Sequence, residues 1–473
     1  MINFDHVTFT YEGQSSPSLT DVSLQVPRGA CVLVSGPSGC GKSTLLRLVN
    51  GLIPHFYEGT LEGNVQVEGT APGDAPLYDQ ASRTGSVFQN PRTQFYTTDT
   101  TSEIAFALEN QGIPAPQIIG RVEQVACDMK LAPLMDRSLF ALSGGEKQKI
   151  ACACVNAAQP DVIVLDEPTA NLDYDASLAL AQLISEWKRD GKTVLIAEHR
   201  IAWVLDQVTQ LVIMNDGRIA DVLDAASLAG VDAGRCRAHG LRTPVLISPD
   251  AVDIPRFDPE ASRHEAWSVD DLHFGYDKGK TVLDFDRIDL AKGAITAVVG
   301  RNGRGKTTFL RCLTGLERKD RSIVHFDGQA WDRKARLDNV FLVRQDVNCQ
   351  LFTQSVAEEV EISLPPAETA SMSDEERTDR INSILSSLDL ADLAQRDPFT
   401  LSGGQKQRVA VACAVASGRP MIAFDEPTSG LGLDHMLRFA DLLRRLVEQG
   451  RTVIVVTHDA ELIQTAADYL LVL

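Results

Sequence analysis

One stretch of the sequence occurs twice, and this repeat restricts the possible fold more than any other feature. "LSGGEKQ" at Leu142–Gln148 returns as "LSGGQKQ" at Leu401–Gln407, 259 positions further along. The glutamates of two "DEP" stretches, Glu167 and Glu426, are also 259 positions apart. A constant offset between matching motifs indicates a duplicated domain. We therefore expect the 473 residues to form two related domains rather than one.

The domain boundaries follow from composition. We expect domain 1 at residues 1–242, a linker at 243–265 that carries four prolines without helical or strand periodicity, and domain 2 at 266–473. After "QLVIM", domain 1 continues into "NDGRIADVLDAASLAG", whereas domain 2 stops at Leu473, the counterpart of Met214. Domain 2 is therefore expected to lack a terminal hairpin and tail.

Each repeat alternates short apolar runs, rich in valine and isoleucine, with longer helical stretches. "CVLVSG" precedes "KSTLLRLVNGL" in the first repeat, and "ITAVVG" precedes "KTTFLRCLTGL" in the second. Apolar runs of this kind are typical of parallel strands buried on both faces by helices. The sequence predicts an α/β fold in both domains.

Charge and composition narrow the function classes. The chain has 45 Lys+Arg against 64 Asp+Glu, a net charge of −19, which opposes non-specific binding to nucleic acid or anionic lipid; we expect no nucleic-acid partner. The start "MINFDHVTFTYEG" lacks the features of a signal peptide, and no apolar stretch approaches the roughly 20 residues of a spanning helix. Nine cysteines without a CxxC pair are expected to be core residues of a reduced, cytosolic protein.

Two glycine-rich loops predict phosphate binding. "GPSGCGKST" at 36–44 and "GRNGRGKTT" at 300–308 both fit G-x-x-x-x-G-K-[ST] between a predicted strand and a predicted helix. In this motif backbone N–H groups surround the phosphates, the lysine reaches the β- and γ-phosphates, and the next hydroxyl binds Mg²⁺. Two intact copies disfavour a plain glycine-rich turn, so ATP and Mg²⁺ are the expected cofactors. The predicted binding residues are Gly36, Ser38, Gly39, Gly41, Lys42, Ser43 and Thr44 in the first loop, and Gly300, Asn302, Gly303, Gly305, Lys306, Thr307 and Thr308 in the second.

Paired acids end a predicted strand in each repeat, in "VIVLDE" and "MIAFDE". Asp166 and Asp425 are predicted to hold Mg²⁺, and Glu167 and Glu426 to activate the attacking water. Acids at a strand end can also simply cap a turn, and the proline after each pair would suit that alternative. Their occurrence beside a P-loop favours the catalytic interpretation.

These motifs occur in many nucleotide hydrolases, whereas LSGGxxQ ahead of "DEP" resembles the ATP-binding cassette superfamily over almost the whole chain apart from the linker. The resemblance implies two P-loop ATPase domains in tandem, each with a parallel or mixed sheet core and a helical subdomain. It also implies a head-to-tail ATPase dimer within one chain, each signature motif closing over the nucleotide of the other P-loop. At a helix start, a serine hydroxyl, glycine amides and the helix dipole would face a γ-phosphate. The signature residues are Ser143, Gly144, Gly145, Ser402, Gly403 and Gly404.

The same resemblance assigns three further pairs. Tyr11 and Tyr276 would stack on adenine, although an ordinary strand aromatic is the alternative. Gln89 and Gln345 would reach Mg²⁺ and the attacking water. His199 and His458 would contact the γ-phosphate and orient the catalytic glutamate.

One position departs from the family pattern. After "DEPT" the first repeat has Asp173, where the second has Gly432. The resemblance implies that this loop crosses to the opposite P-loop, so Gly432 would weaken coupling at the site built from Lys42 and Ser402. Because both catalytic acids and both histidines remain, our hypothesis is two competent but unequal ATP sites.

The segments after the two glutamines, "FQNPRTQFYTTDTTSEIAFALEN" and "RQDVNCQLFTQSVAEEVEISL", resemble the ATPases of energy-coupling factor importers. There a groove holds the coupling helices of a shared transmembrane subunit, and small exchangeable membrane subunits bind vitamins or transition-metal ions. The resemblance implies an ATPase driving transport, peripheral at the cytoplasmic face of the membrane, with both kinds of subunit as partners. Packing of the helical subdomain is the alternative role for Gln94, Phe95, Tyr96, Gln350, Leu351 and Phe352.

Two other roles stay open. The fused ATPases of sugar importers have a similar layout, but often a degenerate second site, whereas "GRNGRGKTT" is intact. Soluble ribosome-associated cassette ATPases tend to have a long charged helical linker and basic extensions, unlike this proline-rich linker and acidic chain. The transported solute is not encoded here, since in this class another polypeptide recognises it.

Overall fold

The computed structural model describes residues 2–228, 230–262, 264–276, 279, 281–326 and 329–473. It forms two compact units: unit 1 comprises Met1–Leu246 with Gly432–Asp434, and unit 2 comprises Ile247–Leu431 with His435–Leu473. The division after Leu246 falls inside the predicted linker at 243–265. The sequence-based domain boundaries stay predictions.

Unit 1 contains two sheets. The larger has the order β5-β6-β7-β3-β8-β9, and all its neighbours pair in parallel except β8 and β9, which are antiparallel. The smaller is antiparallel, with the order β2-β1-β4. The strands are β1 (Ile2–Tyr11), β2 (Leu19–Val26), β3 (Cys31–Ser35), β4 (Gly59–Val67), β5 (Thr84–Val87), β6 (Val162–Asp166), β7 (Thr193–Ala197), β8 (Gln210–Asn215) and β9 (Arg218–Asp224).

The central strand β3 is buried on both faces. Val32 and Val34 join a core cluster that includes helix α1 and the antiparallel sheet. Cys31 and Leu33 point the other way, into a cluster that includes helix α7. Side chains alternate between the faces of a strand, so an unbroken apolar run is what a sheet covered on both sides requires.

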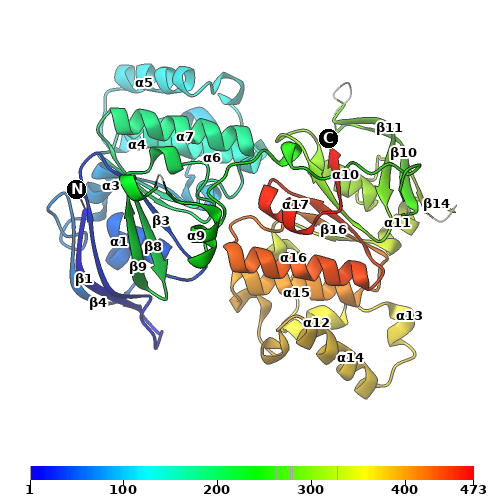
Figure 1. Cartoon of the computed structure of the whole chain (residues 1–473). Coiled ribbons are helices and arrows are strands. Elements are labelled where there is room, and N and C mark those ends of the chain that lie inside the picture. Colours follow the sequence, from blue (N-terminus) through cyan, green and yellow to red (C-terminus); the bar gives the residue numbers. More distant parts are fainter. Residues whose placement is uncertain (1, 229, 263, 277–278, 280, 327–328) are drawn as a thin grey trace. The chain divides into compact units, whose positions relative to one another are not determined.

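The helices of unit 1 fall into two groups (Figure 1). One group packs on the large sheet, and the other, α4 to α6, has a core cluster of its own that includes Ile104, Val125 and Ile150. The helices are α1 (Lys42–Val49), α2 (Leu52–His55), α3 (Leu77–Arg83), α4 (Thr100–Asn110), α5 (Ala115–Asp128), α6 (Gly144–Ala158), α7 (Tyr174–Arg189), α8 (Ala225–Leu228) and α9 (Ala233–Ala238), with 3₁₀ turns η1 (Pro91–Gln94), η2 (Ala132–Leu134), η3 (Leu139–Ala141) and η4 (Leu205–Gln207).

Unit 2 repeats this plan. Its large sheet, β15-β16-β17-β12-β18, is parallel throughout, and its small sheet, β11-β10-β13-β14, is antiparallel. The strands are β10 (Ala266–Phe274), β11 (Leu283–Ala291), β12 (Ile295–Val299), β13 (Ile323–Phe326), β14 (Gln329–Trp331), β15 (Val340–Val343), β16 (Met421–Asp425), β17 (Thr452–Val456) and β18 (Tyr469–Val472).

The helices of unit 2 follow the same order along the chain. They are α10 (Lys306–Leu313), α11 (Arg333–Asn339), α12 (Val356–Glu361), α13 (Pro366–Thr369), α14 (Asp374–Ser387), α15 (Gly403–Ala416), α16 (Leu433–Glu448) and α17 (Ala460–Ala466), with 3₁₀ turns η5 (Pro249–Ala251), η6 (Val347–Cys349), η7 (Ala391–Leu393) and η8 (Pro398–Thr400). The predicted α/β class, with two tandem domains that each have a sheet core and a helical part, is confirmed.

The segment after Leu246 packs on unit 2. Val252 lies in a core cluster with Ala297 and Val299 of β12, and Ile247 packs against the same cluster. The backbone N–H of Leu470 donates to the carbonyl of Pro255 at 2.9 Å. The part of the proline-rich stretch at residues 247–255 therefore packs on the second sheet.

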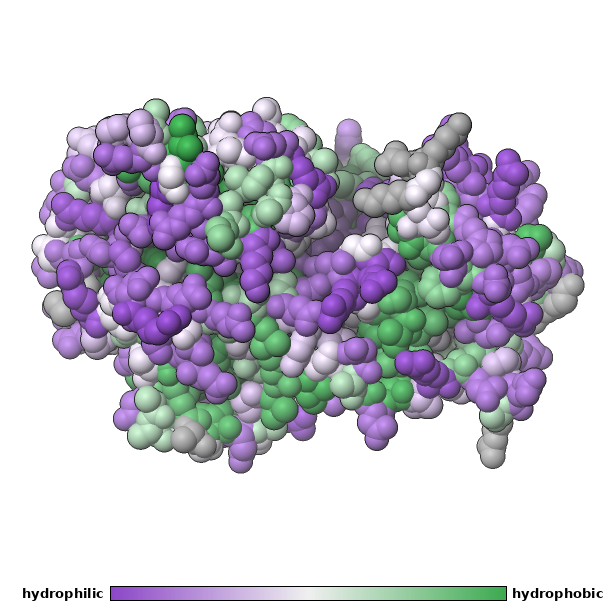
Figure 2. Space-filling view, turned by 90° about the horizontal axis from the view of Figure 1, so that it is seen from above, coloured by the Kyte–Doolittle hydropathy of each residue, from purple (hydrophilic) through white to green (hydrophobic). Residues whose placement is uncertain are grey.

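Most of the surface seen in Figure 2 is hydrophilic, with hydrophobic patches between. Among the described residues, no helix combines the length and the apolar character that crossing a bilayer needs. The nine cysteines are free thiols, and six are buried, as expected. The expectation of a core position is wrong for Cys127 and Cys349, which are exposed.

Candidate functional site

Each P-loop connects a buried strand to a helix, and its lysine folds back over it. Lys42 Nζ donates to the carbonyl oxygens of Gly36 and of the next residue, both at 2.9 Å. Lys306 Nζ donates in the same way to Gly300 O at 2.8 Å and to the following carbonyl at 3.2 Å. Both lysines are buried. A buried ammonium group thus lies at the concave side of each loop, where an anion would complement its charge.

Glycines shape this concave side. Gly39 and Gly303 have φ of 81° and 80°, and a Cβ at either would meet nothing within 4 Å, so both face open space. Gly41 has φ of 99°, and a Cβ there would lie 2.6 Å from the carbonyl oxygen of Ser18. Backbone with positive φ favours glycine and lets N–H groups converge. The loops therefore fit phosphate groups.

The strand-end aspartates lie beside the P-loop hydroxyls, as the sequence predicts. Ser43 Oγ donates to Asp166 Oδ1 at 3.0 Å, and Thr307 Oγ1 donates to Asp425 Oδ2 at 2.9 Å. Burial, together with the charge of neighbouring Glu167, raises the pKa of Asp166 to about 6. Burial also raises the pKa of Asp425. A divalent cation would stabilise both carboxylates, and a hydroxyl with a carboxylate is an oxygen set that Mg²⁺ accepts.

Three predicted catalytic residues of unit 1 form one cluster. Gln89 Nε2 donates to Glu167 Oε2 at 2.7 Å, and His199 Nε2 lies 3.4 Å from Glu167 Oε1. Ser38 Oγ lies 3.5 Å from the same histidine nitrogen. Burial raises the pKa of Glu167 to about 7. A carboxyl group with a pKa near neutrality is suited to take a proton from water.

Unit 2 reproduces this cluster with a different set of contacts. His458 Nε2 lies 3.3 Å from Glu426 Oε1, and the backbone N–H of His458 donates to Glu426 Oε2 at 3.2 Å. The same ring nitrogen lies 3.1 Å from Asn302 Oδ1, in the P-loop. Gln345 is exposed in the bend after β15.

Both glutamates that are predicted to be catalytic have a left-handed backbone conformation. Glu167 has φ of 43° and Glu426 has φ of 49°. Their backbone N–H groups donate to Ala197 O at 2.8 Å and to Val456 O at 2.9 Å, at the end of the neighbouring parallel strand. A non-glycine residue with positive φ is uncommon and often marks a functional site. The neighbouring strand holds each glutamate in this conformation.

A buried acid beside each histidine was missed by the sequence reasoning. In unit 1 Thr169 Oγ1 donates to Glu198 Oε2 at 3.0 Å, and Glu198 Oε1 accepts the N–H groups of His199 and the next residue, both at 3.0 Å. Burial raises the pKa of Glu198. Glu198 precedes the histidine and ties the "DEPT" loop to the end of β7.

In unit 2 the corresponding acid follows the histidine. Thr428 Oγ1 donates to Asp459 Oδ2 at 2.8 Å, and Asp459 Oδ1 accepts the N–H of Leu462 at 3.2 Å. The sequence does contain the signal: "AEHR" against "THD" exchanges the acid across the histidine.

The signature serines begin helices, as predicted. Ser143 and Ser402 are the N-caps of α6 and α15, and each forms a capping box with the third residue of its helix, Glu146 or Gln405. A Cβ at Gly403 or at the glycine after it would meet nothing within 4 Å. Exposed amide groups at a helix start can bind an anion; the role of these residues toward a γ-phosphate stays a prediction.

The two tyrosines are tethered to the helix that follows the P-loop. Tyr11 OH accepts from Arg47 Nη1 at 2.8 Å and lies 3.1 Å from Thr44 Oγ1. Tyr276 OH lies 3.2 Å from Thr308 Oγ1, and the tyrosine is 46% exposed. Both rings are therefore placed close to the phosphate loop, and their stacking on adenine stays a prediction.

The two loops after "DEPT" begin their helices differently. Asp173 caps α7, since its Oδ1 accepts the N–H of Ala176 at 2.9 Å. Gly432 directly precedes α16 and carries no side chain that could accept such a bond. The change from aspartate to glycine therefore removes a capping acceptor from α16. This local effect adds to the weaker coupling that the sequence predicts.

Comparisons with known proteins agree with this geometry. The family described as ABC transporter matches residues 19–170 and 283–429. A protein of Treponema denticola named ABC transporter ATP-binding protein is 41% identical over 476 residues, which cover 100% of this chain and 95% of the relative. A protein of Methanosarcina mazei with the same name is 30% identical over 519 residues, covering 100% and 87%.

Among solved structures, the archaeal ribosome recycling factor aABCE1, in complex with the ribosomal stalk protein aP1, superposes with a TM-score of 0.61. The match covers 99% of this chain and 87% of that chain at 21% identity. It shows a shared fold over both units.

Proposed function

We propose that this chain, which belongs to the ABC transporter family of ATP-binding proteins, energises an importer of the energy-coupling factor type that takes up a vitamin or a metal ion. The chain is an ATPase of that family. The proposal places it at the cytoplasmic face of the membrane, bound to a transmembrane coupling subunit and to small substrate-binding subunits. Its two units would form the head-to-tail ATPase pair within one chain.

The residues described above divide the hydrolytic work. Lys42 and the glycines beside it would bind the phosphates, while Ser43 and Asp166 would hold Mg²⁺, which supplies charge neutralisation. Glu167 would take a proton from the attacking water, and His199 and Gln89 hold its carboxylate in place. The equivalent residues of unit 2 would act in the same way.

A repeated exposed aromatic residue is the observation that carries the importer proposal. Tyr96 is 78% exposed and Phe352 is 70% exposed, at equivalent places in the two post-glutamine segments. A buried carboxylate fixes each segment: Glu103 accepts the N–H groups of Tyr96 at 3.1 Å and of Thr97 at 2.8 Å, and Glu359 accepts the N–H of Phe352. Aromatic side chains held out to solvent by a buried anchor are suited to a partner surface.

The neighbouring residues have the packing role that the sequence left open. Gln94 Oε1 accepts the N–H of Phe88 at 3.0 Å, and Gln350 Oε1 accepts the N–H of Arg344 at 2.7 Å. Leu351 is 3% exposed. We therefore assign the partner surface to Tyr96 and Phe352 and the scaffold to the residues before them.

The relatives also favour a transport role over a ribosomal one. Proteins named ABC transporter ATP-binding protein match over the whole chain at up to 41% identity. The likeness to a ribosome recycling factor, at 21% identity, extends to the fold alone. Energy can pass to a membrane subunit only through contacts that differ between the states of the ATPase, so an exposed anchor in each unit suits a coupling role.

Affinity purification from native membranes in mild detergent tests the partner. We expect the chain to retain one large transmembrane subunit with several different small ones, and Tyr96→Ser with Phe352→Ser to lose them while keeping ATPase activity. Tyr78→Ser is the matched control, since Tyr78 is also 73% exposed but lies on α3. Recovery of a sugar-type permease, or of ribosomes without a membrane protein, would transfer the function to the corresponding alternative.

A separate measurement tests the ATP sites. Lys42→Ala combined with Lys306→Ala should abolish MgATP-dependent turnover, because each substitution removes the buried cation of a P-loop. Lys149→Ala, at an exposed lysine of α6, is the control and should retain turnover. Normal activity in the double variant would overturn the site assignment.

A further inference from the structure

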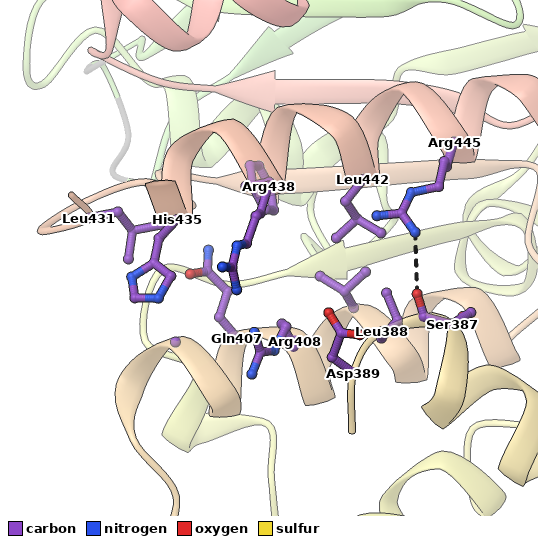
Figure 3. A pocket seen from close by; sticks show the side chains of 13 residues that line it. Ser387, Leu388, Asp389, Gln407, Arg408, Leu431, His435, Arg438, Leu442 and Arg445 are labelled. Atoms are coloured by element: carbon purple, nitrogen blue, oxygen red, sulfur yellow. Dashed lines mark hydrogen bonds between the residues drawn. The ribbon is translucent and has the colours of Figure 1, made fainter. Parts of the chain in front are cut away.

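Unit 2 contains a cavity of about 90 Å³ whose described lining includes Gly404 of the signature motif but none of the P-loop residues. It lies between α16, α15 and the turn at Ser387–Asp389 that ends α14 (Figure 3). Side chains spaced three or four positions apart on α16 point toward α15 in this view. The cavity therefore joins the helix that begins at the signature serine to the helix that follows the "DEPT" loop.

The inner wall of the cavity is apolar. Leu388, Val411, Phe439 and Leu442 line it, and each is at most 7% exposed. The ring of Phe439 packs edge-on against Phe424 of the sheet, with centroids 5.4 Å apart. The wall is therefore anchored to the core of the unit. A cavity of this kind, apolar with a few polar groups, is typical of small-molecule sites.

The rim of the cavity is basic. Arg408, Arg438 and Arg445 line it together with His435, against one acidic residue, Asp389. This concentration of positive charge contrasts with the net charge of −19 of the whole chain.

The hydrogen bonding of the rim is incomplete. Arg445 Nη1 donates to Ser387 O at 3.3 Å (Figure 3). In the part of the chain that the structure describes, the buried Nε of Arg408 has no hydrogen-bond partner. A buried donor of this kind is stabilised by any acceptor that reaches it.

The equivalent place in unit 1 has different chemistry. At the same offset of 259, His435 and Arg438 correspond to alanines and Arg445 corresponds to Glu186. Leu388 corresponds to Met129, which packs against the core cluster there. Two other positions are basic in unit 1 as well, since Arg408 corresponds to Lys149 and Asp389 to Lys130. What is specific to unit 2 is the histidine and the two arginines on α16.

We propose that this cavity binds a small organic anion, in which one ring or short apolar body occupies the apolar wall and a carboxylate or phosphate group meets the arginines. Guanidinium groups bind such anions through paired, charge-assisted hydrogen bonds. The anion would also supply an acceptor for Arg408 Nε. This site goes beyond the proposed function, since of the described residues that line it only Gly404 belongs to the predicted nucleotide-binding set and none to the partner surface.

Fluorine NMR on the full chain tests the proposal with 4-fluorobenzoate as the probe and neutral 4-fluorobenzamide as the matched ligand. The variant Arg438→Ala with Arg445→Glu gives the rim two of the residues found in unit 1. The variant Arg218→Ala with Arg237→Glu makes the same change in net charge at exposed positions of unit 1 and serves as the control.

We expect 4-fluorobenzoate to bind the native chain and the control variant equally, and the rim variant at least about tenfold more weakly, as the loss of charge-assisted hydrogen bonds predicts. The benzamide should bind much more weakly than the benzoate in the native chain. Equal benzoate affinity in the native chain and the rim variant, or equal affinity for benzoate and benzamide, would overturn the proposal.

Discussion

Units 1 and 2 hold equivalent histidine loops with an acid on opposite sides of the histidine. In unit 1 the acid is Glu198, before His199; in unit 2 it is Asp459, after His458. Each acid is 3% exposed and accepts a hydrogen bond from the threonine of its "DEPT" loop. The contact between the two loops is therefore kept in both copies, whereas the residue position that provides it is not.

The position of the acid can therefore change while the contact between the two loops is kept. The loop that begins with the predicted catalytic glutamate must be fixed against the loop that carries the histidine, because the two side chains lie within 3.4 Å of each other. A buried carboxylate with several donors can do this from either neighbouring position. The two copies differ more at the start of the next helix, where Asp173 caps α7 and glycine precedes α16.

The largest expected effect is on turnover. Glu167→Gln and Glu426→Gln each remove a general base, a loss of about 10²- to 10⁴-fold at the affected site. Lys42 and Glu167 belong to the same ATP site, and our hypothesis is that Gly432 weakens this site. Glu426→Gln, at the other site, should therefore remove the larger share of the steady-state ATPase activity. Equal losses from the two variants would contradict unequal sites.

The second effect concerns pH and stability. Burial raises the pKa of Glu167 to about 7, from an ordinary value of 4.5. The native chain therefore loses stability as pH rises from about 4.5 through 7, since the folded state disfavours the charged form, by up to about 3 kcal/mol. Glu167→Gln carries no such charge, so without nucleotide it should unfold at a higher temperature than the native chain at pH 8, with a smaller difference at pH 5.

Thermal unfolding at the two pH values measures this effect. Glu123→Gln is the control, because Glu123 is an exposed residue of α5. A difference between Glu167→Gln and the native chain that is the same at pH 5 and at pH 8 would show that the burial of this carboxyl group does not cause it.

The third effect tests the exchanged acids directly. Glu198→Ala and Asp459→Ala each leave a buried threonine hydroxyl and backbone N–H groups without their acceptor, so each should destabilise its unit by about 2 kcal/mol. Adding Thr457→Glu to Asp459→Ala rebuilds in unit 2 the order found in unit 1 and should recover part of the loss. Urea unfolding measures both the loss and the recovery of stability. An absence of recovery would mean that the residues around each acid require it at its own position, before or after the histidine.

The smallest effect concerns the missing cap. Gly432→Asp adds an N-cap acceptor to α16 and should be stabilising, whereas Asp173→Gly removes one from α7 and should be destabilising. Because glycine is itself a tolerated N-cap, each change should be only about 0.3 kcal/mol. Combined with Glu426→Gln, which isolates the site of Glu167, Gly432→Asp should raise ATPase turnover. If stability rises and turnover does not, the glycine is a capping defect only, and the hypothesis of weakened coupling fails.

Local motifs were predictable from the sequence because adjacent residues determine them. The P-loop lysines, the strand-end acids and the signature serines lie where their spacing places them, at the junctions of strands and helices. The unit 1 contact of Gln89 with Glu167, at 2.7 Å, also agrees with the prediction. Such motifs need only a strand, a turn and a helix in the expected order.

Contacts between distant segments were not predictable in the same way. The partner of Glu198 is Thr169, on a different loop, and only the parallel pairing of β6 with β7 brings them together. The packing of Val252 on β12 was likewise hidden, since a proline-rich stretch has no periodicity that would indicate a buried face. Both depend on which strands become neighbours.

The sequence by itself determined the duplication, the α/β class and the residues that would bind and hydrolyse ATP, because motif spacing and apolar runs are properties of the chain. The tertiary structure decided which acid fixes each histidine loop, that Tyr96 and Phe352 face solvent while Leu351 is buried, and that arginines from different helices share a cavity in unit 2. The physical reason is that burial and hydrogen bonding depend on distances between segments far apart in sequence, and only packing sets those distances.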